Sequence, residues 1–194
     1  RILEALDETG QSEDTLVIFM SDHGEMLGDH GIYFKGPHFY DCQMRVPLVI
    51  RWPAGGIQSG RRIGGMIELV DLAPTLLDAA GLEVPGRMQG KSLLPMLKGE
   101  GESGYVHEQV FAEYYNAWTH GDAYGTMLRT DREKIVVYHG TDQGEFYDLE
   151  KDPEEFFNLW DHPDAQGRKY EMLMRCFDAS VFSMDPHPPR MGPF

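Results

Sequence analysis

Residues 16–24, LVIFMSDHG, carry the pattern that decides the fold. A short continuous apolar run containing valine and isoleucine ends there in the polar turn Ser21-Asp22-His23-Gly24. Such a run is typical of a strand that is buried on both faces of a parallel sheet. We therefore predict a buried parallel strand over residues 16–20, with Asp22 and His23 just beyond its carboxyl end.

The segments on either side of this strand predict an α/β layer. Residues 2–6 place apolar side chains on one helical face, and Gly10 stands where a left-handed C-cap would end that helix. A second buried strand is expected over residues 46–52. A second helix is expected over residues 71–80, with Asp71 as its cap.

The second half of the chain predicts a small antiparallel sheet. The composition shifts to Gly, Glu, Ser and Lys around residues 95–104, so we expect one unit over residues 1–98 and another over residues 99–194. Short β-rich segments separated by turn residues follow, as in a meander. They cover residues 110–115, 125–129, 134–138 and 145–149. A C-terminal helix is then expected to cover that sheet. Its apolar face would consist of Tyr170, Leu173, Phe177 and Val181.

The composition excludes several classes of partner. Lys and Arg total 17 against 32 Asp and Glu, and the net charge of -15 opposes binding to nucleic acid or to anionic membranes. No apolar run approaches the roughly 20 residues of a membrane span, and no signal-peptide pattern is present. Cys42 and Cys176 lack the spacing of a disulfide framework or a zinc site, and Cys42 is interpreted as a small buried hydrophobe. The compartment stays open between the cytoplasm and the periplasm of a bacterium.

The Asp22-His23 pair is the strongest local chemical feature. Ligands of open α/β sheets collect at the carboxyl ends of strands, and Gly24 opens a turn that could aim both side chains at one point. A carboxylate and an imidazole are suitable ligands for a divalent cation. The alternative is structural, with Asp22 as a turn or helix cap and His23 as a hydrogen-bonded loop residue.

Residues 24–41 form a long glycine-punctuated loop, and such loops often carry function. Lys35 could bind an anionic oxygen near a metal, or it could be a solvated surface charge. His30 and His38 could donate a proton or contact substrate, or they could be loop histidines bonded to backbone. No HExxH, GxSxG, Walker or GxGxxG motif competes with this loop.

Several motifs in a fixed order resemble the sulfatase family. They are residues 21–31 (SDHGEMLGDHG), Lys35-Gly36, residues 45–48 (RVPL), residues 69–77 (LVDLAPTLL), and residues 146–155 (FYDLEKDPEE) with Asn158-Leu159. The resemblance implies a mixed sheet with helices of the alkaline phosphatase-like superfamily, followed by the small antiparallel sheet and its helix. In residues 146–155 four motif residues are interpreted as structural. Tyr147 and Asp148 would end a strand, and Asp152 and Pro153 would form the turn that follows.

The resemblance also implies a formylglycine nucleophile beside one divalent metal ion. That residue derives from Cys or Ser in a Cys/Ser-x-Pro/Ala-x-Arg segment, which this sequence lacks. Together with the start at Arg1, this leads us to expect the C-terminal part of a longer protein. Its missing N-terminal part would supply the nucleophile and two acidic metal ligands, so the fragment alone is expected to be inactive.

Carried over one position at a time, Asp22 and His23 match metal ligands and Lys35 matches the lysine that holds the sulfate oxygens. His38 is expected to contact substrate. The metal would be Ca²⁺ or, since His23 is a softer ligand, Mn²⁺. The implied reaction is hydrolysis of a small sulfate monoester of a sugar or an aryl alcohol. A phosphonate monoester or phosphodiester hydrolase and an inactive scaffold homologue are the alternatives. An apolar sheet face could also support a homodimer.

Overall fold

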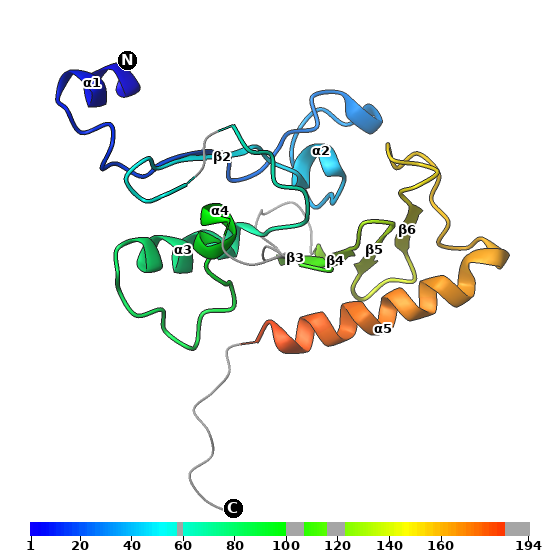
Figure 1. Cartoon of the computed structure of the whole chain (residues 1–194). Coiled ribbons are helices and arrows are strands. Elements are labelled where there is room, and N and C mark those ends of the chain that lie inside the picture. Colours follow the sequence, from blue (N-terminus) through cyan, green and yellow to red (C-terminus); the bar gives the residue numbers. More distant parts are fainter. Residues whose placement is uncertain (58–59, 100–106, 116–122, 185–194) are drawn as a thin grey trace, which may run out of the picture.

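The computed structural model describes residues 1–57, 60–99, 107–115 and 123–184 as a mixed α/β arrangement with two separate sheets (Figure 1). The elements, in chain order and with η for 3-10 helices, are α1 (Ile2–Glu8), β1 (Val17–Met20), η1 (Asp29–Gly31), α2 (Asp41–Met44), β2 (Leu48–Arg51), η2 (Leu69–Asp71), α3 (Leu72–Ala79), α4 (Leu94–Lys98), β3 (Val110–Tyr115), β4 (Tyr124–Arg129), β5 (Glu133–Tyr138), β6 (Gly144–Asp148), η3 (Pro163–Ala165) and α5 (Gln166–Phe182).

The four-stranded sheet confirms the predicted meander. Its strand order is β3-β4-β5-β6, and every neighbouring pair is antiparallel. β6 ends at Asp148, and the Asp152 carboxylate accepts hydrogen bonds from the backbone N–H groups of Phe156 and Phe157 at 3.0 and 2.7 Å. The structural interpretation of this strand end and of the following turn is therefore confirmed.

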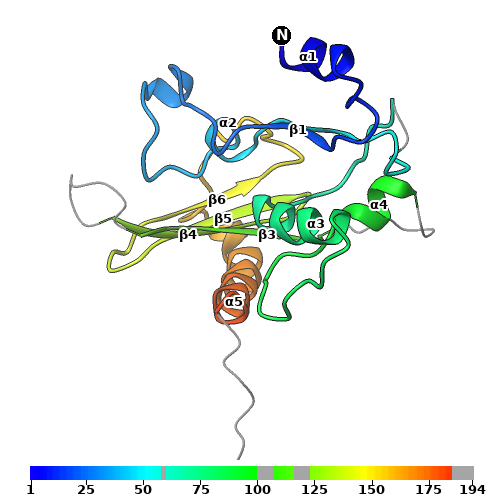
Figure 2. The ribbon, with the colours of Figure 1, turned by 90° about the vertical axis from the view of Figure 1, so that its left-hand side faces the viewer.

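This sheet is covered on both faces, as Figure 2 shows, with α5 on one side and the segment around α2 on the other. Because successive strand residues point to opposite faces, Leu128 and Ile135 pack toward α5 whereas Met127 and Val136 pack toward Phe39. The loop that contains Phe39 comes from the first half of the sequence. The two halves of the chain thus share a core at this sheet.

The C-terminal helix covers the sheet, but the predicted contact face was wrong. Met172 and Cys176 are the residues of α5 that are buried against the sheet, whereas Tyr170, Phe177 and Val181 are exposed. The helix carries apolar side chains on more than one face, and the face with Met172 and Cys176 is the one that lies against the sheet. Only Leu173 of the predicted face packs partly against that core.

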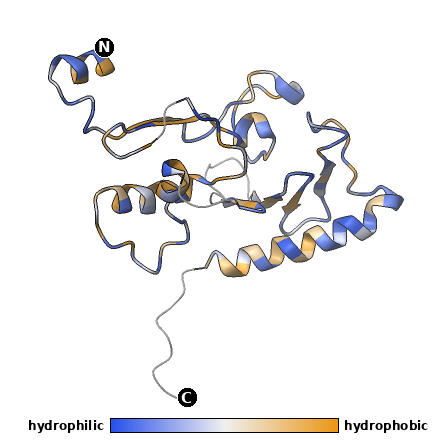
Figure 3. Cartoon of the chain, in the orientation of Figure 1, coloured by the Kyte–Doolittle hydropathy of each residue, from blue (hydrophilic) through white to orange (hydrophobic). Residues whose placement is uncertain are grey.

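The two-stranded sheet differs from the prediction in its pairing and in its burial. β1 and β2 are antiparallel, and Phe19 lies opposite Val49 with exposed fractions of 65% and 60%. Figure 3 shows these strands as largely hydrophobic. An apolar run indicates burial but not the direction of its partner, and the described part of the chain leaves this face uncovered. The other side of β2 packs on a small core through Leu48 and Ile50.

Asp71 begins helix α3 in sequence, as predicted, but its side chain does not cap that helix. Its fully buried carboxylate accepts hydrogen bonds from the backbone N–H groups of Glu68 and Lys91, each at 2.9 Å, and lies 2.9 Å from His107 Nε2. It therefore fastens three separate segments together. None of the helices that the structure describes is long and apolar enough to cross a membrane.

Candidate functional site

The turn after β1 places Asp22 and His23 at an exposed edge. The Asp22 Oδ2 atom lies 3.7 Å from His23 Nε2, and the exposed fractions of the two side chains are 84% and 39%. Ser21 Oγ donates to the carbonyl of His23 at 2.7 Å, and the backbone N–H of His23 donates to Asp22 Oδ1 at 3.1 Å. The turn is thus held by its own hydrogen bonds, and both side chains point to the same place.

Lys35 reaches this turn from twelve residues further along the chain. Its ammonium Nζ lies 2.7 Å from His23 Nε2. The structure therefore brings together three of the five residues singled out from the sequence, namely Asp22, His23 and Lys35. The backbone N–H groups of Asp22 and His23 lower the pKa of the Asp22 carboxyl, with smaller contributions from His23 and Lys35, so it is ionised at neutral pH.

The hydrogen bonds of His23 define which ring nitrogen is available to a ligand. Nδ1 lies 2.7 Å from the carbonyl oxygen of Gly24, which can only accept, so Nδ1 carries the proton. Nε2 then presents its lone pair, and in this arrangement it accepts from Lys35. This tautomer, fixed by a backbone carbonyl, is the form in which histidine binds metals. The chemistry of the pair therefore fits a divalent cation.

The pair is not a complete metal site by itself. Within the described ranges, no group of three or more His, Cys, Asp or Glu side chains could hold a metal ion. A divalent cation at Asp22 and His23 would need further ligands from outside these residues or from water. That two acidic ligands come from another part of a longer protein stays a prediction.

His38 is separate from this group of three. In the part of the chain that the structure describes, no hydrogen bond or ion pair joins its ring to Asp22, His23 or Lys35. The ring is half-buried and lies 6.4 Å from the ring of Tyr40. Burial lowers the pKa of His38, against a weaker raising effect of Glu145, so the neutral imidazole is favoured.

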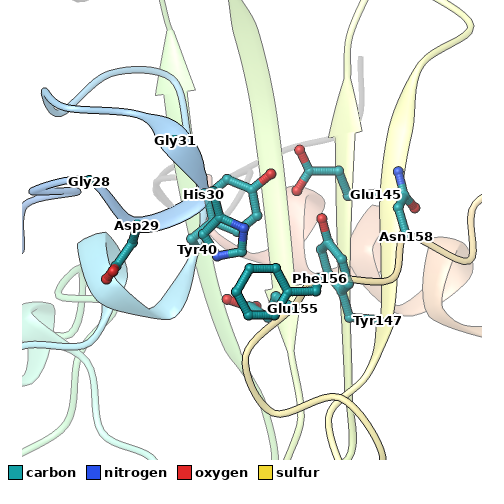
Figure 4. Close-up of a pocket in the computed structure, with 10 residues that line it drawn as sticks. All are labelled: Gly28, Asp29, His30, Gly31, Tyr40, Glu145, Tyr147, Glu155, Phe156 and Asn158. Atoms are coloured by element: carbon teal, nitrogen blue, oxygen red, sulfur yellow. The ribbon is translucent and has the colours of Figure 1, made fainter.

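His30 lines a pocket of about 610 Å³ between η1 and β6 (Figure 4). Its ring stacks on Tyr40 with centroids 3.8 Å apart. The described residues that line it are Gly28, Asp29, His30, Gly31, Tyr40, Glu145, Tyr147, Glu155, Phe156 and Asn158. Among the described residues, three carboxylates and no Lys or Arg line this pocket, and their negative charge opposes binding of a sulfate group. The edge beside Lys35 is the better place for an anion.

A buried ion cluster that the sequence did not lead us to expect lies behind this loop. Lys134 on β5 is fully buried, and its ammonium donates to the Phe39 carbonyl at 2.9 Å and to Asp41 Oδ1 at 2.5 Å, and it pairs with Glu155. Arg129 also binds Asp41, with both contacts at 3.3 Å. The available signal was a lysine inside the apolar strand pattern KIVVY.

The shifts within this cluster follow from burial and pairing. Burial opposes ionisation of Asp41, but Lys134 and Arg129 together outweigh it and lower its pKa. For Glu155, burial dominates and raises the pKa, against the lowering effect of Lys134. The other notable carboxyl nearby is that of Glu145, which accepts from Tyr138 at 2.8 Å.

The environment of Cys42 disfavours the thiolate form that a nucleophile needs. Burial raises the pKa of its thiol, as do the carboxylates of Asp29 and Glu155. Its sulfur contacts the sulfur of Met26 at 3.5 Å, and the side chain is half-buried. The interpretation as a small hydrophobe therefore holds in part.

Comparisons with known proteins identify the family of this chain. The family model described as N-sulphoglucosamine sulphohydrolase, C-terminal, matches residues 28–179. An N-acetylglucosamine-6-O-sulfatase from Bacteroides thetaiotaomicron is 36% identical over 163 residues, which is 80% of this chain and 28% of that protein.

Solved structures extend the likeness to the fold. A protein solved in complex with its substrate D-glucosamine-2-N,6-O-disulfate superimposes with a TM-score of 0.85 at 30% identity, over 99% of this chain and 39% of that one. The phosphonate monoester hydrolase of Agrobacterium radiobacter gives a TM-score of 0.84 at 32% identity, over 95% and 38% of the two chains.

The chain thus spans between about a quarter and two fifths of the proteins that it resembles. Those proteins are a sulfatase, a protein bound to a sulfated amino sugar as its substrate, and a hydrolase of a related ester. The family model covers most of the sequence, including Lys35, the buried cluster and the whole four-stranded sheet. By its sequence and its fold, this chain belongs to the sulfatase family of the alkaline phosphatase-like superfamily and corresponds to the C-terminal region of its members.

Proposed function

We propose that this chain is the C-terminal part of a metal-dependent hydrolase of sulfate monoesters, in which Asp22 and His23 supply two ligands of one divalent cation. The observation that carries the proposal is the meeting of three suited groups at one exposed edge. A carboxylate oxygen lies 3.7 Å and an ammonium lies 2.7 Å from the same imidazole nitrogen. The carboxylate of Asp22 and the imidazole of His23 could hold a cation, and the ammonium of Lys35 could hold an anion next to it.

Each residue has a role that follows from its contacts. The bound cation would polarise the sulfate group and stabilise its developing charge. The ionised Asp22 carboxylate and the fixed tautomer of His23 would hold that cation. Lys35, which here donates to His23 Nε2, would turn to the negative oxygens of the ester. His38 would contact the substrate as a neutral imidazole further along the same loop.

The nucleophile in this proposal lies outside the chain. The family resemblance implies a formylglycine whose hydroxyl attacks sulfur, and the 194 residues contain no segment that would yield it. The exposed pair Phe19 and Val49 fits a surface that the rest of a longer protein covers, because apolar residues of this size are seldom left in water as a patch. This fragment alone would then be inactive.

A phosphonate monoester or phosphodiester hydrolase is the second candidate. The structural likeness to the phosphonate monoester hydrolase of Agrobacterium radiobacter favours it. The imidazole ligand at His23 favours Mn²⁺ or another transition ion over Ca²⁺ in either case. The relatives that act on sulfated sugars support a sugar sulfate as the substrate class.

The test is turnover of an aryl sulfate and of an aryl phosphonate monoester, side by side, by the complete reading frame with Ca²⁺ or Mn²⁺ supplied. We expect preference for the sulfate, and we expect Lys35→Met to lower kcat about 10²- to 10³-fold, as removal of an oxyanion contact does. Lys151→Met is the matched control, because that lysine is 80% exposed and pairs only with Asp148 among the described residues.

Three results would contradict parts of this proposal. Preference for the phosphonate would favour the second candidate. Unchanged turnover in Lys35→Met would remove the anion-binding role of Lys35. No turnover of either ester by the wild type would favour an inactive scaffold homologue.

A further inference from the structure

Gln43 is a buried polar residue that contacts both turns of the candidate site. It lies in α2, and its side chain is 9% exposed. It was not singled out from the sequence, where it only follows Cys42. Its side chain contacts the turn that follows Lys35, and its backbone contacts the turn of Asp22 and His23.

The side-chain amide of Gln43 holds the turn that follows Lys35. Its Oε1 accepts from the backbone N–H of Gly36 at 3.2 Å. Its Nε2 donates to the carbonyls of Gly36 and His38, each at 2.8 Å. Both polar groups of Gly36 are therefore bound by one planar amide, directly beside Lys35.

The backbone of Gln43 holds the turn that carries the metal-ligand pair. Its carbonyl accepts from the N–H of Gly24 at 2.7 Å, and Gly24 directly follows His23. The approach is close, since a Cβ on Gly24 would lie 2.0 Å from the carbonyl oxygen of Cys42. Glycine is required here because α2 occupies the space of any side chain.

We propose that Gln43 is a positioning residue that ties the turn of Asp22 and His23 to the turn of Lys35. This inference rests on the proposed function of that site. Only glutamine among the common side chains of this size offers one acceptor and two donors in a plane at this reach. Without its amide, the carbonyls of Gly36 and His38 lose their donors, and the 2.7 Å separation of Lys35 Nζ from His23 Nε2 is no longer held.

The experiment compares Gln43→Met with the wild type in the complete protein. Methionine keeps the size of the side chain and removes its three hydrogen bonds. Gln166→Met is the matched control, because the Gln166 amide also donates to two carbonyls, those of Trp160 at 3.0 Å and His162 at 2.8 Å, in a segment distant in sequence from the site. Gln43→Asn is a milder second variant, since it keeps the amide and shortens its reach.

Two readouts separate positioning from simple stability. The first is hydrogen exchange of the Gly24 amide, which the Gln43 side chain does not touch. We expect it to lose protection in Gln43→Met and, to a lesser degree, in Gln43→Asn. The second is the affinity for Mn²⁺ measured by calorimetry, which we expect to fall at least about tenfold, as for other supports of metal ligands. Gln166→Met should change neither.

The inference would be overturned if Gln43→Met left both the Gly24 exchange and the Mn²⁺ affinity unchanged and made exchange faster at Gly36 alone. A wild-type protein that hydrolyses neither ester would instead contradict the proposed function. The Gly24 exchange would still decide the role of Gln43 in that case, because it does not depend on turnover.

Discussion

Two clusters, each with acidic and basic side chains, involve the same loop, and they differ in how far their charges are paired and buried. The ammonium of Lys134 is fully buried and meets the Phe39 carbonyl and the carboxylates of Asp41 and Glu155. The carboxylate of Asp22 is mostly in water, and among the described residues it contacts only its own turn. A closed cluster fixes structure, whereas an open pair with spare donor atoms is ready to accept a ligand.

Breaking the closed cluster is expected to have the largest effect. Lys134→Met in the complete protein leaves the buried carboxylate of Glu155 without its cation and leaves Asp41 with Arg129 alone, which should cost about 3–5 kcal/mol of unfolding free energy. Lys151→Met is the control, because its exposed pair with Asp148 is worth at most about 1 kcal/mol. Urea unfolding measures both. Equal losses in the two variants would contradict the contrast between a closed and an open environment.

A side chain at Gly24 should have the next largest effect. The Cβ of Gly24→Ala would meet the carbonyl oxygen of Cys42 at 2.0 Å, so the backbone of one turn must move. We expect a loss of about 1–3 kcal/mol, as for overpacked sites. Gly86→Ala is the matched control, since no atom lies within 4 Å of its Cβ position and its φ is not in the left-handed region. Thermal unfolding that shifts equally in both variants would refute a tight contact at Gly24.

The dependence of the unfolding free energy on pH in acid should depend on Asp41. Its pKa is lowered in the folded chain by Lys134 and Arg129, which outweigh burial, although Glu155 with its raised pKa also faces the cluster. As the pH falls below about 4, Asp41 takes up its proton in the unfolded state before it does so in the folded state. The stabilisation that ionised Asp41 gives to the folded state is therefore present above that pH and is lost below it. Asp41→Asn should remove the part of the fall in unfolding free energy below about pH 4 that is due to Asp41. Asp161→Asn is the control, because Asp161 is exposed. The same pH dependence of the unfolding free energy in wild type and Asp41→Asn would contradict a role of Asp41.

The smallest effect on stability is expected at the open site itself. Lys35 is exposed, and Lys35→Met should change the unfolding free energy by no more than about 0.5 kcal/mol. Thermal unfolding measures this, alongside the turnover assay above. A loss as large as that of Lys134→Met would mean that Lys35 is part of the core and not an anion-binding residue.

The fold could be predicted where the signals are local. The four strands of the meander follow from β-rich segments between turn residues, and the structure confirms them within a residue or two. The direction of β1 and the buried face of α5 depend on which other elements cover them, and the pattern of one segment does not contain that information. The division of the chain at residues 98 and 99 stays a prediction, and the Lys134 cluster crosses it.

The candidate site divides in the same way. Asp22, His23 and Lys35 could be found because they lie close together in a motif-bearing loop after a strand. Lys134 could not, because its partner Asp41 lies 93 residues away and only folding brings them together. Gln43 was missed for another reason, since its contacts are with backbone groups that no sequence pattern reveals.

The most direct test of the account is metal binding by the complete, metal-stripped protein, measured by calorimetry with Ca²⁺ and Mn²⁺ for the wild type and for His23→Ala. We predict one ion per chain in the wild type, tighter for Mn²⁺, and loss of that tight binding in His23→Ala. The same stoichiometry and affinity in both proteins would show that the ion, if any, lies elsewhere and would contradict the assignment of the Asp22–His23 edge as a metal site.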